Sequence, residues 1–97
     1  MQVEMKIGNM LVEFNQTELI IDIRGHKRSI TVNRFHDLIE ETAISFGNSN
    51  SVYIYALPDE SCVIVLRDSD CNESQHLSKG EMTLLKIAVY SYYGLNK

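Results

Sequence analysis

Apolar and polar residues alternate along the first third of the chain, in short segments separated by turn residues. A period of two is typical of a strand with one buried face. The segments that follow this period are residues 2–7, 10–14, 18–24 and 27–32. The turns between them fall at residues 8–9, 15–17 and 25–26. Glycine and asparagine tolerate the positive φ of tight hairpin turns. We therefore expect an antiparallel meander of four strands, with a type II′ turn that starts at Gly25.

Two later segments change to the helical period. Asn33 is a favourable N-cap, and apolar residues then recur every three or four positions until Gly47. Both ends of the second segment are marked in the sequence. Ser78 and Glu81 form a capping box, and Gly94 stands where a left-handed C-cap belongs. We predict two helices, of which the second is the more apolar.

Residues 51–57 and 62–67, between the predicted helices, are apolar on both alternating faces. Strands of this kind are covered on both sides in a folded protein. One helix can cover one face, so the other face requires the second helix or another chain. Residues 68–77 are acidic and polar, and we interpret them as a loop. The result is one α+β domain of residues 1–97, with an antiparallel sheet, two helices and the order ββββ-α-ββ-α.

The helix predicted for residues 78–93 is apolar nearly all round. This pattern fits a central helix buried on several sides, and it also fits a helix whose edge meets a second chain. Tyrosine is favoured in interfaces because it combines a large apolar body with a hydroxyl that tolerates water. The residues that we expect at a protein interface are Leu84, Ile87, Tyr90, Tyr93, Tyr53 and Tyr55.

Charge and composition narrow the class of partner. The 97 residues carry a formal net charge of -4, and the longest basic cluster is residues 26–28. Nucleic-acid binding needs clustered Lys and Arg, so nucleic acid is not an expected partner. No signal-like leader and no segment long enough to span a bilayer is present, so we expect no membrane contact. Two cysteines are too few for a disulfide framework, which favours a cytoplasmic setting.

No segment of the sequence matches a metal-binding or catalytic motif closely. Residues 68–72 begin like a calcium-binding loop, but Glu73 replaces the required glycine and Lys79 replaces the bidentate glutamate. Cys71 and His76 lack the further ligands of a zinc site. The sequence contains no nucleophile elbow and no glycine-rich phosphate loop. We expect no catalytic residue, no metal and no cofactor.

Asp37, Glu40 and Glu41 are neighbours on the first predicted helix. They form either an ordinary solvated face or an acidic docking face for a basic partner.

Two functional hypotheses remain. The first is a small, non-catalytic protein-binding module that forms a homodimer, such as a stoichiometric inhibitor, an immunity protein, an adaptor, or a phage or mobile-element antagonist of a host factor. The second is a small-ligand-sensing domain or minor enzyme with a pocket between sheet and helix. The candidate polar groups for that pocket are His36, Asp37, Arg67 and His76. The order of elements from Met10 onward resembles that of small dimeric secretion chaperones, which begin with a helix where this chain begins with a strand.

Overall fold

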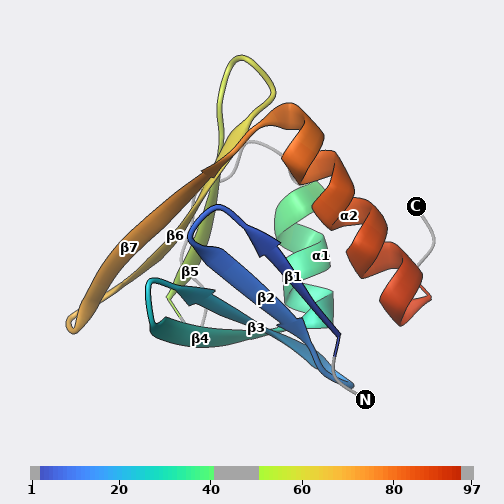
Figure 1. The fold of residues 1–97 in the computed structure, drawn as a ribbon, viewed down its shortest axis with the longest axis horizontal. Coiled ribbons are helices and arrows are strands. Elements are labelled where there is room, and N and C mark those ends of the chain that lie inside the picture. The colour runs from blue at the N-terminus through green and yellow to red at the C-terminus, as the bar shows by residue number, and fades with distance from the viewer. Residues whose placement is uncertain (1–2, 41–50, 95–97) are drawn as a thin grey trace.

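The structure is a computed structural model that describes residues 3–40 and 51–94. The first four strands are β1 (Val3–Ile7), β2 (Met10–Phe14), β3 (Glu18–Ile23) and β4 (His26–Thr31). The remaining described elements are α1 (Val32–Glu40), β5 (Val52–Ala56), β6 (Cys62–Asp68), β7 (Cys71–Leu77) and α2 (Lys79–Tyr93). The strands form two antiparallel sheets, in the orders β1-β2-β3-β4 and β5-β6-β7 (Figure 1). The predicted α+β class, with antiparallel strands and two helices, is confirmed.

The four-stranded sheet follows the predicted meander, with one change in a turn. The pair Ile7 and Met10 closes a two-residue turn between β1 and β2, as expected. Between β3 and β4, however, Ile23 pairs with His26, so the turn residues are Arg24 and Gly25. Both have positive φ, at 52° and 90°. The prediction of a turn at residues 25–26 was therefore wrong by one position.

Strand β7 lies where the sequence predicted an acidic loop. Only its first and last residues, Cys71 and Leu77, are buried apolar side chains on the inner face of the sheet. The two positions between them on that face are Glu73 and Gln75, so the pattern of alternation is hidden. The loop interpretation of residues 68–77 was wrong because these two polar side chains contact the four-stranded sheet.

Polar contacts join the two sheets. The backbone N–H of Asn9 donates to Gln75 Oε1 over 2.9 Å, and Arg24 Nη1 donates to the Ser74 carbonyl over 3.2 Å. Farther along, Arg28 Nη2 donates to Asp68 Oδ2 over 2.6 Å. The Asp70 backbone N–H and the Arg28 guanidinium lower the pKa of Asp68. The four-stranded sheet is thereby fixed against the β6–β7 hairpin of the other sheet.

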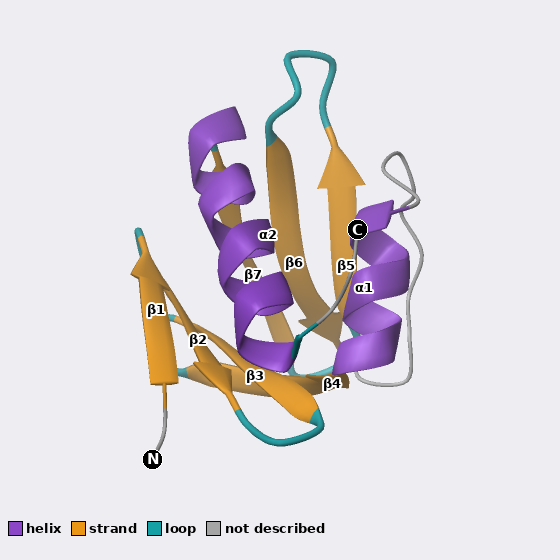
Figure 2. Cartoon of the chain, turned by 90° about the vertical axis from the view of Figure 1, so that its right-hand side faces the viewer, coloured by secondary structure: helices purple, strands orange, loops and turns teal. Residues whose placement is uncertain are grey.

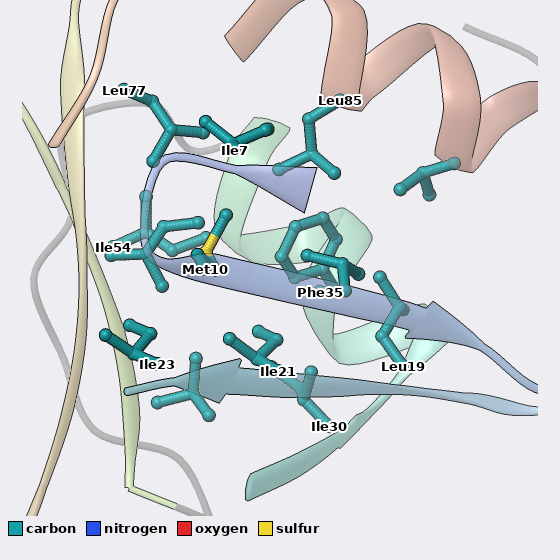
Figure 3. Packing of buried hydrophobic residues seen from close by; sticks show 14 of the residues in the cluster. Ile7, Met10, Leu19, Ile21, Ile23, Ile30, Phe35, Ile54, Leu77 and Leu85 are labelled. Atoms are coloured by element: carbon teal, nitrogen blue, oxygen red, sulfur yellow. The ribbon is translucent and has the colours of Figure 1, made fainter. Parts of the chain in front are cut away.

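Both helices lie on the same face of the β5–β7 sheet (Figure 2). The core lies where this face, the helices and the four-stranded sheet meet (Figure 3). Buried side chains that meet there include Met10, Ile21, Phe35, Ile54, Leu77 and Leu85. The question left open by the sequence is thus answered for the described elements: α2 covers the inner face of β5–β7, and the outer face has no helix.

The helix ends follow local side-chain chemistry. The Ser78 hydroxyl accepts from the Glu81 N–H, the Glu81 carboxylate accepts from the Ser78 N–H, and Gly94 is left-handed. These predicted caps of α2 are confirmed. Helix α1 begins at Val32, two residues earlier than an N-cap at Asn33 predicts, and Thr31 Oγ1 accepts from the Arg34 N–H. The predicted end of this helix at Gly47 lies outside the described residues.

Candidate protein-binding surfaces

The outer face of the β5–β7 sheet is formed by residues that point away from both helices. Strand register pairs Tyr53 with Val65 and Tyr55 with Val63, and on the far side of β6 it pairs Val65 with Ser74 and Val63 with His76. We call Tyr53, Tyr55, Val63 and Val65 the tyrosine face. Val65 is 5% exposed although it lies outside the main core cluster, and the other three are half-buried. No described helix or strand covers this face in Figure 1.

The aromatic rings of this face are held by one another and by a cation. The rings of Tyr53 and Tyr55 stack with centroids 6.3 Å apart and planes 11° apart. The guanidinium carbon of Arg67 lies 5.7 Å from the Tyr53 ring centroid, within the range of a cation–π contact. The tyrosine face is therefore an ordered apolar surface with a positive charge at one end.

The opposite end of the tyrosine face has a buried hydroxyl between two titratable groups. Ser61 is 4% exposed; its Oγ donates to Asp59 Oδ1 and lies 3.1 Å from His76 Nε2. The hydrogen bond from the Ser61 hydroxyl lowers the pKa of Asp59. In a Ser-His-Asp triad the carboxylate orients the imidazole, whereas here it accepts directly from the serine. The group therefore fixes the β5–β6 turn, and the buried serine is not presented to a substrate.

The outer face of the four-stranded sheet is more highly charged than the tyrosine face. It has two half-buried apolar side chains, Leu11 and Ile20, among many charged ones. The charged residues on that face are Glu4, Lys6, Glu13, Glu18, Asp22 and Lys27. Such a face is typical of a sheet with one solvated side. The tyrosine face has no such charged rows.

A second exposed apolar region lies on α2. Leu84 and Ile87 are 58% and 56% exposed, and both lie on the side of the helix away from the core. The sequence placed both at an interface, and the structure leaves both side chains available for one. They lie on the opposite side of the β5–β7 sheet from Tyr53 and Tyr55, so the six predicted interface residues do not form one surface.

The other two predicted interface residues have contacts within the chain. Tyr90 is buried, and its ring lies 5.5 Å from that of His36 on α1. The hydroxyl of Tyr93 donates to the Glu18 carbonyl over 3.0 Å, and burial raises the pKa of Tyr93 to about 12. Tyr90 therefore belongs to the core, and Tyr93 ties the end of α2 to β3.

The predicted acidic docking face is only partly described. Asp37 is exposed on α1, Glu40 ends that helix with its side chain outside the described part, and Glu41 lies outside the described residues.

The polar groups of the alternative pocket do not converge. His36 and Asp37 are on α1, on the inner side of the β5–β7 sheet, whereas Arg67 and His76 are on its outer face. Two shallow hollows of about 390 Å³ lie elsewhere, one beside Lys6 and Asp22 and one beside Thr17 and Asn33. No specific observation favours the ligand-sensing or enzymatic alternative.

The two thiols are poor nucleophiles in this fold. Both cysteines are free and buried. Burial raises the pKa of Cys62 to about 11, and its Sγ lies 3.4 Å from Met82 Sδ. The Sγ of Cys71 lies 3.6 Å from the Leu66 carbonyl oxygen. Within residues 3–40 and 51–94, no group of three His, Cys, Asp or Glu side chains is placed to hold a metal ion.

No helix among the described residues is long and apolar enough to cross a membrane. No family model matches the chain, and neither does any curated protein or solved structure.

Proposed function

We propose that this chain is a small, non-catalytic protein-binding module that acts by stoichiometric contact, and that the tyrosine face is the surface that meets its partner. The single observation behind this proposal is the placement of both helices on one side of the β5–β7 sheet. Two half-buried tyrosines and two valines are left on the other side, where no described element covers them.

The chemistry of the tyrosine face fits protein recognition. Tyrosine and arginine are among the side chains most enriched at positions that dominate binding energy. Tyr53, Tyr55 and Arg67 occur together here, on rigid strands rather than on a loop. A partner that fits this face has an apolar patch with a carboxylate at the edge that meets Arg67. An inhibitor, immunity protein, adaptor or antagonist would each use such a surface, and the two free cysteines favour a cytoplasmic protein.

Affinity capture from the source cell with matched variants tests this proposal. Tagged wild-type chain, Tyr55→Ser and Leu11→Ser are compared by quantitative mass spectrometry. Leu11→Ser is the control because Leu11 is also half-buried and apolar, but lies on the outer face of the other sheet. We expect one protein to be captured at a fixed ratio by the wild type and Leu11→Ser, and to be lost with Tyr55→Ser. Equal capture by all three chains would contradict the assignment of the tyrosine face.

A further inference from the structure

The solvent-exposed side of α2 is unusual because its centre is uncharged. Gly80, Leu84, Ile87 and Ser91 lie along this side at spacings of three and four residues. We call these four residues the α2 face; all four are exposed. A solvated helix normally carries charged and polar residues at such positions. Here the middle of the face has two large aliphatic side chains, and each end has a small residue.

The charged residues of α2 are engaged away from this face. Glu81 accepts from the Ser78 N–H over 2.8 Å in the capping box. Lys79 Nζ lies 3.2 Å from Glu60 Oε1 in the β5–β6 turn. Lys86 is half-buried and lies near enough to the thiol of Cys62 to affect its pKa. Among the residues of α2, all of which are described, none places a charge at the centre of the α2 face.

We propose that a second copy of this chain covers the α2 face, with the two α2 helices antiparallel about a two-fold axis between Leu84 and Ile87. Each Leu84 then packs against Ile87 of the second copy, and each Gly80 lies opposite Ser91. The order small, large, large, small has the same sizes when it is read from either end. A two-fold interface requires this kind of self-complementarity. The small residues at both ends also leave room for the two helix axes to cross at an angle, as is usual for packed helices.

Charge favours the α2 face over the outer face of the four-stranded sheet for self-association. The chain has a formal net charge of -4, so two copies repel each other over most of their surfaces. The outer face of the four-stranded sheet has four carboxylates, at Glu4, Glu13, Glu18 and Asp22. The neutral α2 face allows two copies to touch without placing like charges opposite one another. Antiparallel packing also brings together opposite ends of the two helix dipoles.

This inference does not rest on the proposed function, because the tyrosine face lies on the other side of the β5–β7 sheet. One 15-residue helix per copy buries less than the roughly 800 Å² per partner that is typical of a stable complex. We therefore expect a weak, concentration-dependent dimer.

Sedimentation equilibrium from about 10 μM to about 1 mM tests the dimer over the matching range of affinities. The wild type is expected to rise from 11.1 kDa toward twice that mass. Ile87→Asp, at a 56% exposed position, is expected to stay folded and monomeric throughout. Leu57→Asp is the control, because it makes a similar change at an exposed apolar position outside α2, and it should associate like the wild type. A monomeric wild type, an associating Ile87→Asp or a monomeric Leu57→Asp would each overturn the proposal.

Engineered cysteines test the orientation without adding a charge. An added Cβ at Gly80 meets nothing closer than Ser78 Oγ at 4.0 Å, so Gly80→Cys fits the helix. Mixing Gly80→Cys with Ser91→Cys under oxidation is expected to give a covalent heterodimer. Either variant alone is expected to crosslink poorly, since its two sulfurs would lie about 16 Å apart along the axis at 1.5 Å per residue. Efficient crosslinking of Gly80→Cys to itself, or none in the mixture, would overturn the antiparallel arrangement.

Discussion

Two consecutive leucines of α2 differ in how much they contribute to stability. Leu85 is 0% exposed and Leu84 is 58% exposed. Leu85→Ala leaves a cavity in the core, and we expect it to lower the free energy of unfolding by about 2–5 kcal/mol. Leu84→Ala should change it by less than about 0.5 kcal/mol. Urea unfolding at low protein concentration, followed by circular dichroism, measures both. Similar losses for the two variants would contradict the orientation of α2.

Tyr93 links the end of α2 to β3 through one hydroxyl. Tyr93→Phe removes this bond and should lower the free energy of unfolding by about 1 kcal/mol at neutral pH. The folded-state pKa of about 12 is above the ordinary value of 10.0. The phenol therefore contributes stability that is present below pH 10 and is lost as the pH rises toward 12.

The same variant provides the pH test. We expect the wild type to lose more stability than Tyr93→Phe between pH 10 and 12. Cys62, with its pKa raised to about 11, contributes the same alkaline loss to both proteins. Thermal unfolding across this pH range measures the difference. If the stability of the two proteins falls equally between pH 10 and 12, folding does not raise the pKa of Tyr93, which would contradict the burial of its hydroxyl.

Side chains near the end of α2 show what sequence alone can predict at this scale. The sequence placed Leu84 and Ile87 at the edge of α2 that could meet a second chain, and both are exposed. It also grouped Tyr90 with them, but Tyr90 packs against His36 on α1. The spacing of residues within α2 contains no information about where α1 lies, so this contact could not be predicted.

At the scale of elements, the ion pair of Arg28 and Asp68 joins β4 to the β6–β7 hairpin. The lowered pKa of Asp68 means that its carboxylate contributes stability above its ordinary pKa of 3.8, and that this stability is lost as the pH falls through the folded-state value. Asp68→Asn should therefore be less stable than the wild type at pH 7. It should also lose less further stability in acid.

Asp70→Asn is the matched control, because Asp70 is exposed in the same turn and its backbone N–H, not its side chain, bonds to Asp68. We expect its stability at pH 7 to match the wild type. Thermal unfolding from pH 7 to pH 3 checks both variants. An Asp68→Asn variant as stable as Asp70→Asn at pH 7 would contradict a stabilising role for this junction.

Most of the elements were predictable from the sequence because each had its own local signal. Alternation identified the first four strands, and the capping box with Gly94 identified α2. Strand β7 had no such signal, since Glu73 and Gln75 occupy inward positions where they contact another sheet. The division into two sheets was also missed. Alternation reports which residues share a face, but it does not report which strands share a sheet.

At the scale of the whole molecule, the position of the helices decides which surfaces remain. From the sequence, we expected one face of residues 51–57 and 62–67 to be covered by a helix, and the other face to require the second helix or another chain. Only the structure shows which side is left uncovered, and that Tyr53 and Tyr55 lie on that side. If α2 pairs as proposed, the tyrosine faces of the two copies point away from each other, and one dimer presents two binding surfaces. A partner with two matching sites would then bind with avidity.

Titration calorimetry of the captured partner, with wild type, Tyr55→Ser and Leu11→Ser, is the most direct test of the tyrosine face. We predict one partner site per chain and a loss of affinity of about tenfold or more for Tyr55→Ser, as for a residue that dominates binding energy. Leu11→Ser should bind like the wild type. Unchanged affinity for Tyr55→Ser, or an equal loss for Leu11→Ser, would contradict binding through the outer face of β5–β7.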